Sequence, residues 1–263
     1  MGTHRFALLG FGNVGRAFAR LLLAKGDELL SQHDLRWQVV GIMTGHHGAA
    51  VNQNGIALEH ALAMIEAEES LNPLSTEPAP HNGVEFVHAC NADVLFENTP
   101  VSYHDGQPAI DHISAALSAG MHAITANKGP VVHAYRELTE MAQAHGRNFF
   151  FESTVMDGAP VFSLWREALP AAELQSFRGI LNSTTNLILT LMEQGQTFEE
   201  AVAHTQSIGI AETDPSGDIE GWDAAIKVSA LVTVLMDANL KPSAVERKGI
   251  ESLDSEDIKS AAA

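Results

Sequence analysis

The chain has 263 residues, which is enough for one large domain or two smaller ones. Its formal net charge of −18 argues against binding to nucleic acid and to anionic membranes, because both need clustered lysine and arginine. Cys90 is the only cysteine, and no apolar run reaches the roughly 18 residues that span a membrane, so we expect a soluble, cytoplasmic protein.

The first 150 residues alternate between short apolar runs and amphipathic stretches. Short apolar runs between turn signals predict strands, and apolar residues at helical spacing predict helices. The predicted strands are 6–9, 35–43, 92–100, the start of 121–130, and 148–154. The predicted helices are a stretch that contains 14–29, then 55–69, 107–120 and 130–146, and a proline-containing loop covers 70–83. This alternation indicates βαβ units and a parallel sheet that is wound on both faces.

The pattern changes near residue 150, where we place a domain boundary. The segment "ELQSFRGILN" at 173–182 predicts a strand of a different sheet, and three helical stretches follow at 183–194, 198–207 and 218–237. We therefore expect residues 1–150 to form an α/β domain with a doubly wound parallel sheet. Residues 151–263 are expected to form a second domain of the α+β class.

A glycine-rich turn, "GFGNVG", directly follows the first predicted strand and opens the first predicted helix. Gly10, Gly12 and Gly15 match the G-x-G-x-x-G fingerprint of Rossmann-type dinucleotide-binding domains, in which the glycines allow a tight turn, close approach of a pyrophosphate and helix–strand packing. Exposed N–H groups and the helix dipole favour an anion there. The alternative is a strand–helix turn that is merely tight. The predicted cofactor-binding residues of the turn are Gly10, Phe11, Gly12, Asn13, Val14 and Gly15.

The loop after the second predicted strand bears on the choice between NAD and NADP. An acidic residue usually binds the ribose 2′-hydroxyl of NAD at this place. Here the loop reads "MTGHHG", with no Asp, Glu or Arg, so neither cofactor is favoured. His46 and His47 are candidates to meet a 2′-phosphate, and the alternative is that both are solvated loop residues.

The stretch "GIAETDPSGDIEGWDAAIK" at 209–227 crowds carboxylates in front of one lysine. Its acidic residues are Glu212, Asp214, Asp218, Glu220 and Asp223, and its lysine is Lys227. Asp223 and Lys227 are four residues apart and so share one face of a helix. From the residues alone, two hypotheses stay open. One is a solvated loop with a surface pair worth about 0.3–0.5 kcal/mol; the other is a pocket for a cationic group with a lysine that moves a proton.

Several stretches together resemble one known family. They are "GFGNVG", "TANKGPV", "FESTVMDGAPV", "GILNSTTNLIL", "GIAETDPSGDIEGWDAAIK" and "KGI", and their order and spacing are similar to those of homoserine dehydrogenases. The resemblance covers nearly the whole chain, and the run 179–227 is its most specific part. It implies NAD(P)-dependent interconversion of L-homoserine and L-aspartate 4-semialdehyde in the biosynthesis of threonine and methionine. It also implies a homodimer whose second domain carries the interface and most of the substrate pocket.

The resemblance implies roles for individual residues. Lys227 matches the family's proton-transfer lysine, and Lys128, in "TANK", matches a second lysine near the substrate and the nicotinamide. The residues matched to substrate binding are Glu212, Asp218, Asp223 and Thr184. On the cofactor side, Gly209 matches a family glycine, while Thr99 and Pro100 end a predicted strand and are expected to line the nicotinamide. The alternative for Lys128 is a surface lysine beside a helix.

The stretch "ESTVMDGAP" resembles the family's loop for a monovalent cation such as sodium. The implied ligands are a side-chain oxygen of Glu152 and the carbonyl oxygens of Val155, Asp157 and Ala159. The alternative is a structural turn. The histidines show neither H-E-x-x-H nor H-x-x-E-H spacing, so no zinc site is expected.

Two features depart from the family pattern. Ser183 stands where glycine is usual, and the chain ends before the C-terminal tail that family members carry. We expect a C-terminally short member with an incomplete second sheet, and the explanations left open are a natural short homologue, a truncated form, or a chain completed by a partner. The alternative functions are a cofactor-binding or regulatory homologue with impaired catalysis, and a dehydrogenase for another amino or oxo acid.

Overall fold

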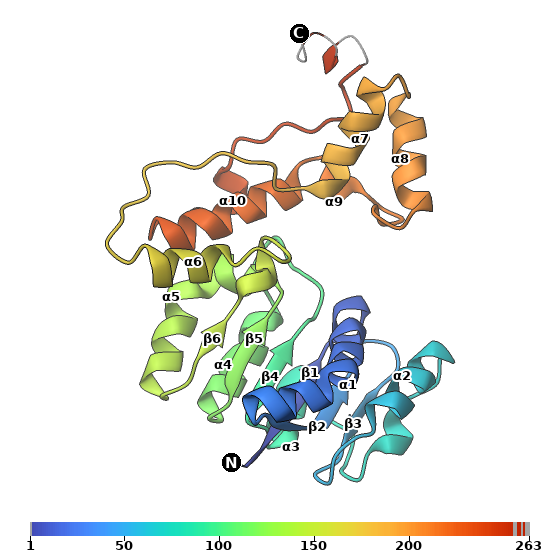
Figure 1. Ribbon diagram of the computed structural model, residues 1–263, viewed down its shortest axis with the longest axis vertical. Coiled ribbons are helices and arrows are strands. Elements are labelled where there is room, and N and C mark those ends of the chain that lie inside the picture. Colours follow the sequence, from blue (N-terminus) through green and yellow to red (C-terminus); the bar gives the residue numbers. More distant parts are fainter. Residues whose placement is uncertain (1, 255–256, 259, 261–263) are drawn as a thin grey trace. The chain divides into compact units, whose positions relative to one another are not determined.

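In the computed structural model, which describes residues 2–254, 257–258 and 260, the chain divides into two units, Met1–Thr154 and Val155–Ala263 (Figure 1). The first unit holds a six-stranded sheet with the order β3-β2-β1-β4-β5-β6. The strands are β1 (Thr3–Leu9), β2 (Arg36–Met43), β3 (Ala49–Val51), β4 (Val94–Glu97), β5 (His122–Thr125) and β6 (Phe149–Phe150). All neighbouring strands pair in parallel except β2 and β3, so the predicted doubly wound parallel sheet is confirmed.

Helices of the first unit cover both faces of the sheet. They are α1 (Asn13–His33), α2 (Leu58–Glu66), α3 (Gly83–Cys90), α4 (Ala109–Ser118) and α5 (Lys128–Ala144), with short 3₁₀ helices η1 (Asn72–Leu74) and η2 (Glu152–Thr154). Along β1, Phe6 and Leu8 belong to a core cluster with α1 and α2, while Ala7 and Leu9 belong to a second cluster with α3 and α4. All four side chains are buried, as expected for a strand that is covered on both sides.

Besides the two short 3₁₀ helices, one strand and one α-helix of the first unit were not predicted. β3 is an antiparallel edge strand, which is formed because the five residues after β2 turn back, with Thr44 N–H bonded to the carbonyl of Gly48 at 3.0 Å. The second is α3, whose N-cap Asn82 accepts a hydrogen bond from Glu85 N–H at 2.9 Å. An Asn followed three residues later by Glu is a visible helix-start signal, so the sequence did contain evidence for α3.

Among its described residues, the second unit contains helices and irregular segments but no strand. The helices are α6 (Val161–Ala168), α7 (Ser183–Glu193), α8 (Phe198–Ser207), α9 (Ser216–Ile219), α10 (Trp222–Leu235) and the 3₁₀ helix η3 (Pro242–Ala244). Helices α7, α8 and α9 meet in a small core that includes Ile188, Met192, Ala201 and Ile219. The predicted helix at 218–237 is in fact two, because Gly221 adopts φ +83° between α9 and α10.

The predicted strand at 173–182 is not formed. The segment runs without regular structure, and Ile180 within it is 72% exposed. A strand is stable only when its backbone groups pair with a neighbour, and the described part of the second unit offers none. The prediction of a strand here is therefore wrong. Across the described residues of both units, no helix is both long and apolar enough to cross a membrane.

Candidate active site

Packing of the protein itself requires two of the three glycines in the β1–α1 turn. Gly10 has φ +90°, and a Cβ there would clash with the carbonyl of Asn98, just after β4. A Cβ at Gly15 would clash with the carbonyl of Gly10, because α1 packs closely on the turn. Only glycine fits either position, which explains the first and third glycines of the fingerprint.

Gly12 is different, because nothing in the fold demands a glycine there. Apart from its chain neighbours, no atom of the described residues lies within 4 Å of the position that a Cβ would take, and φ is −78°. Gly12 is the N-cap of α1, where no side chain makes a cap hydrogen bond and the first turn carries no acidic residue. Open space above the N–H groups of the first helical turn, at a positive helix end, fits the pyrophosphate of a dinucleotide.

The remaining turn residues contribute in different ways. The side chain of Phe11 is buried in the core, so only its backbone faces the turn. Asn13 Oδ1 accepts a hydrogen bond from Arg16 at 2.8 Å, and Val14 is exposed. The turn therefore offers a ligand its backbone rather than its side chains.

The turn lies at the switch point of the sheet, between β1 and β4, where strand order reverses. The loops after β4 and β5 lie at the same carboxyl edge. Asn127 Nδ2 donates to the carbonyls of Thr99 at 3.1 Å and Pro100 at 3.3 Å, and Asn127 also caps α5, which begins at Lys128. The structure thus places the predicted nicotinamide-side residues together, beside the turn, with Lys128 half-buried.

The loop after β2, 44–48, contains no carboxylate. Thr44 Oγ1 accepts a hydrogen bond from His47 N–H at 2.6 Å, which shapes the loop. His46 is exposed, and His47 is half-buried. The geometry agrees with either NAD or NADP, because the group that usually selects NAD is lacking.

In the second unit, Lys227 lies in a partly buried polar cluster. Its Nζ is 2.8 Å from Asp223 Oδ2 and donates to the carbonyl of Leu181 at 2.7 Å. The side chains of Lys227 and Asp223 are only 16% and 11% exposed, so the hypothesis of a solvated surface pair does not hold. Lysine and aspartate are seldom buried unless they are paired, and here both are.

Asn182 joins this pair to a second carboxylate. Its Nδ2 donates to Asp218 Oδ1 at 2.6 Å and to Asp223 Oδ2 at 2.9 Å. Its Oδ1 accepts from the backbone N–H of Thr185 at 2.7 Å, which caps α7. One side chain therefore fixes the start of α7 against α9 and α10, and we call Asn182, Asp218, Asp223 and Lys227 the acid–lysine cluster.

Comparisons with known proteins test the family resemblance. The family model for homoserine dehydrogenase matches residues 160–263, and the model for the homoserine dehydrogenase NAD binding domain matches residues 10–152. The NAD(+)-dependent homoserine dehydrogenase of Pseudomonas canavaninivorans is 36% identical over 264 residues, which cover 99% of this chain and 74% of that protein. This chain belongs to the homoserine dehydrogenase family. The resemblance that the motifs indicated is thereby confirmed.

Other homoserine dehydrogenases support the assignment. The one from Methanocaldococcus jannaschii is 37% identical and covers 95% of this chain and 74% of its own length. The crystal structure of the putative homoserine dehydrogenase from Archaeoglobus fulgidus superposes with a TM-score of 0.85 at 29% identity, covering 99% of this chain and 77% of that one. A hyperthermophilic archaeal homoserine dehydrogenase in complex with NADPH gives a TM-score of 0.81 at 29% identity, covering 97% and 76%.

Not every residue assigned from the homoserine dehydrogenase resemblance joins the acid–lysine cluster. Thr184, in the first turn of α7, is buried, and its hydroxyl lies 3.5 Å from the carbonyl of Ile210. Glu212 is exposed, and its backbone carbonyl accepts from Gln206 Nε2 at 3.1 Å. Gly209 is exposed with φ +75°. Their substrate and cofactor roles stay predictions.

Two further acids of the 209–227 stretch have structural partners. Hydrogen bonds from the side chain and backbone N–H of Ser216 lower the pKa of Asp214, which is a turn residue. Glu220 Oε2 accepts from Trp222 Nε1 at 3.0 Å. Of the five acids in this stretch, Asp218 and Asp223 belong to the cluster, while Asp214 and Glu220 have local partners.

The proposed cation ligands fall on both sides of the division between the units. Glu152 belongs to η2 in the first unit, and Val155, Asp157 and Ala159 belong to the second. Among the described residues, no group of three or more His, Cys, Asp and Glu side chains is arranged to hold a metal ion. The monovalent cation site, built mainly from backbone carbonyls, stays a prediction.

Sequence reasoning missed Asn182 as a site residue. Its place before a helix gives the signal of an N-cap, and the structure confirms that role. Its bonds to two carboxylates join residues 36 and 41 positions apart in the chain. No local pattern reports such a contact.

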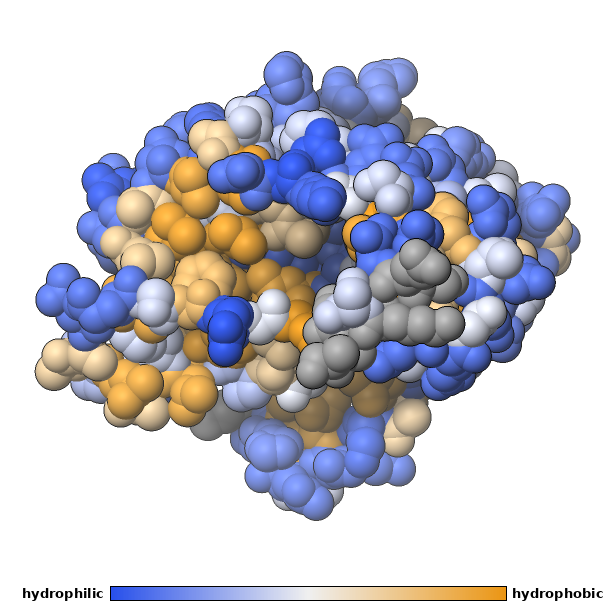
Figure 2. All heavy atoms as spheres, turned by 90° about the horizontal axis from the view of Figure 1, so that it is seen from above, coloured by the Kyte–Doolittle hydropathy of each residue, from blue (hydrophilic) through white to orange (hydrophobic). Residues whose placement is uncertain are grey.

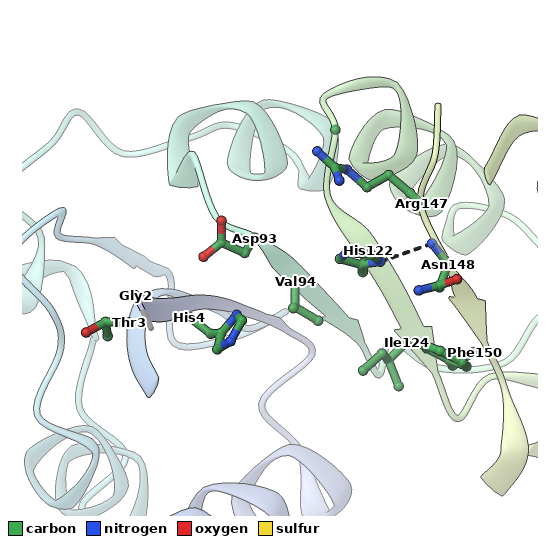
Figure 3. Close-up of a pocket in the computed structure, with 11 residues that line it drawn as sticks. Gly2, Thr3, His4, Asp93, Val94, His122, Ile124, Arg147, Asn148 and Phe150 are labelled. Carbon is green, nitrogen blue, oxygen red and sulfur yellow. Dashed lines mark hydrogen bonds between the residues drawn. The ribbon is translucent and has the colours of Figure 1, made fainter. Parts of the chain in front are cut away.

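A cavity of about 590 Å³ lies at the opposite end of the sheet (Figure 3). It is lined by the starts of parallel strands, including His4, Val94 and His122, together with Asn148. His122 Nδ1 accepts from Asn148 N–H at 3.0 Å, and burial, followed by the charge of Arg147, lowers the pKa of His122. Ligands of such sheets bind at the carboxyl ends of strands, so this cavity is not part of the candidate active site.

Proposed function

We propose that this chain interconverts L-homoserine and L-aspartate 4-semialdehyde, with NAD or NADP as the second substrate. Membership of the homoserine dehydrogenase family supports the proposal. The observation that carries it in this chain is the acid–lysine cluster, in which a partly buried lysine lies 2.8 Å from one carboxylate and Asn182 ties that carboxylate to another. Such a cluster offers anions to an ammonium group and an amine to a hydroxyl group.

Substrate binding is assigned first to charge. Homoserine and aspartate 4-semialdehyde both carry an ammonium group, which carboxylates bind through charge-assisted hydrogen bonds. We assign this contact to Asp218 and Asp223, which Asn182 holds side by side. Glu212 and Thr184 are proposed as further contacts on the strength of the family resemblance. The cluster lies partly out of water, which strengthens its electrostatic interactions with a bound substrate.

Proton transfer is assigned to Lys227. In the oxidation, the neutral amine accepts the proton of the homoserine hydroxyl while a hydride leaves the carbon that bears this hydroxyl. In the reverse direction, the ammonium form donates that proton to the carbonyl oxygen of the semialdehyde. An ammonium has three donors, and the bonds to Asp223 and Leu181 account for two of them, so one remains for the substrate oxygen. These bonds also fix the position of Nζ, which general acid–base catalysis requires.

The first unit is assigned to the dinucleotide. Backbone N–H groups of residues 10–15 bind the pyrophosphate, and Thr99, Pro100 and Lys128 line the nicotinamide side, with Gly209 proposed as a further contact. When bound, the nicotinamide supplies the hydride acceptor or donor. Lys128 is proposed to contact the substrate as well.

The test is a homoserine-oxidation assay with each cofactor. Purified protein should form reduced nicotinamide only when both L-homoserine and NAD or NADP are present, and the ratio of kcat/KM values gives the preference. The proposal would be overturned if folded protein that binds NADPH did not reduce NAD or NADP in the presence of homoserine. A higher kcat/KM for a different hydroxy amino acid would overturn the assignment of homoserine as the substrate.

We also propose that the protein is a cytoplasmic homodimer that associates through the second unit. Large apolar side chains are exposed there, namely Met156, Leu164, Leu169, Ile180, Ile208, Ile210 and Met236. Figure 2 shows apolar side chains gathered on the left of the view. Contiguous exposed apolar surface is typical of protein interfaces. A molar-mass measurement in solution tests the stoichiometry, and a monomer at micromolar concentration would contradict it.

A further inference from the structure

A fully buried carboxylate lies at the end of β4, and the mechanism above does not use it. Glu97 has no exposed surface, and it follows the equally buried Leu95 on the same face of the strand. Burial of an ionised carboxylate is costly unless hydrogen bonds and a counter-charge compensate it. Such a residue at the ligand-binding edge of the sheet needs a physical explanation.

The partners of Glu97 come from three elements. Thr99, in the loop after β4, donates its backbone N–H to Oε1 at 3.0 Å and also its hydroxyl. Thr125, the last residue of β5, has its hydroxyl 2.9 Å from Oε2. His112 of α4 is buried with Nδ1 3.7 Å from Oε1, and that nitrogen has no hydrogen-bond partner among the described residues. Every partner is a donor or, for His112 when protonated, a cation, so the set suits a carboxylate.

The network continues from Glu97 to the start of α5. The Thr125 hydroxyl that faces Glu97 also accepts from Asn127 N–H at 2.9 Å. Asn127 in turn holds the carbonyls of Thr99 and Pro100 through Nδ2, and its Oδ1 accepts from Gly129 N–H at 2.9 Å. Gly129 is the second residue of α5 and follows Lys128. Glu97 is thus hydrogen-bonded to the loop after β4 and linked through Thr125 and Asn127 to the start of α5, and these two segments carry the proposed nicotinamide-side residues.

Glycines around the network show that its geometry is tightly determined. A Cβ at Gly129 would lie 2.8 Å from Gly106 Cα, and a Cβ at Gly106 would lie 2.9 Å from the carbonyl of Gly129, so the post-β4 loop packs backbone to backbone on α5. A Cβ at Gly83 would clash with Nε2 of His112. The imidazole is therefore seated directly on the backbone at the start of α3, which limits its movement.

We infer that Glu97 is a positioning residue for the reaction: it fixes the loop of Thr99 and Pro100 and the start of α5 at Lys128 in one mutual arrangement, with His112 as its buried partner. This inference rests on the proposed function, because it concerns residues assigned there to the nicotinamide and the substrate. Displacement of a catalytic group by about 1 Å costs on the order of 10²-fold in rate. A buried hub that sets two loops at once is placed to prevent such displacement.

The experiment compares Glu97→Ala and Glu97→Gln with Leu95→Ala as a matched control. Leu95→Ala removes a buried side chain from the same face of the same strand but none of the network, so it reproduces the loss of core packing alone. For folded protein, we expect Glu97→Ala to lower kcat about 10²-fold. Glu97→Gln, which keeps the shape and the bond to Thr99 N–H, should restore kcat to within about tenfold of wild type, and Leu95→Ala should leave it within about threefold.

Hydrogen–deuterium exchange without cofactor or substrate gives a second readout that does not depend on activity. Glu97→Ala should accelerate exchange at 98–103 and 125–129, and Leu95→Ala should not do so selectively. If wild type does not oxidise homoserine but these exchange changes occur, the proposed function fails and the loop-fixing role of Glu97 stands. Wild-type kcat in Glu97→Ala, an equal loss of kcat in Leu95→Ala, or unchanged exchange in both loops would overturn the inference.

Discussion

The glycine-rich turn of the first unit and the acid–lysine cluster of the second are built in opposite ways. The turn uses six consecutive residues, and it offers a ligand backbone groups and empty space. The cluster draws four side chains from the start of α7, from α9 and from α10, and its hydrogen bonds cross up to 46 positions of the chain. The turn should therefore be sensitive to an added Cβ, and the cluster to the removal of a single polar group.

The largest expected effect is that of Lys227→Ala. Loss of the proposed proton-transfer group should lower kcat by about 10²–10⁴-fold, while the dissociation constant for NADPH changes less than about threefold. Lys241→Ala, at an exposed lysine of the same unit, is the control and should behave like wild type. Steady-state kinetics and fluorescence titration with NADPH measure both quantities. Loss of NADPH binding in folded Lys227→Ala protein would contradict the assigned role.

A contrasting pair of glycine substitutions tests the turn. Gly12→Ala meets open space, so it should cost less than about 1 kcal/mol in stability but weaken dinucleotide binding at least about tenfold by filling the approach of the pyrophosphate. Gly10→Ala should instead destabilise the fold by about 1–3 kcal/mol or more, because φ is +90° and the Cβ meets Asn98. Denaturant unfolding and calorimetric titration with NADPH separate the two effects. Equal loss of stability in both variants would show that Gly12 is structural.

Asn182→Ala tests the link that the cluster needs. The change removes the N-cap of α7, worth about 1 kcal/mol, and leaves Asp218 and Asp223 without their shared donor. We expect kcat/KM for homoserine to fall about 10–100-fold. Thr197→Ala is matched to it, because Thr197 caps α8 in the same unit with a similar loss of stability. If both variants lose activity equally, Asn182 acts only as a cap.

The smallest effect is expected from Ser216→Ala. The hydrogen bonds of Ser216 hold the pKa of Asp214 below its ordinary value of 3.8. A carboxyl whose pKa is lower in the folded than in the unfolded protein stabilises the fold at pH values above its unfolded-state pKa. That contribution is lost as the pH falls through its folded-state pKa. Ser216→Ala should therefore raise the pKa of Asp214 and change the stability little at neutral pH. On acidification below pH 3.8, the variant should lose less stability than wild type. An NMR titration of the Asp214 carboxyl checks the direction, and activity at neutral pH should be unchanged.

The sequence predicted most of the fold because its evidence is local. The alternation of apolar runs with amphipathic stretches placed five of the six strands and the helices α1, α2, α4 and α5. β3 was missed because it is only three residues long, and the strand at 173–182 was predicted wrongly because extended character does not supply a pairing partner. Gly221 divides a helix that looked continuous, since its φ of +83° is a property of the folded chain.

The sequence by itself determined the glycine-rich turn and, through its motifs, the family, because consecutive residues set backbone geometry and their spacing is visible in the letters. Only the tertiary structure decided that Lys227 is paired and partly buried, that Asp214 belongs to a turn and Asp218 to the cluster, and that Asn182 and Glu97 are central to two networks. The physical reason is that burial and hydrogen bonding of charged groups depend on which distant segments pack together, and that choice is made by the fold as a whole.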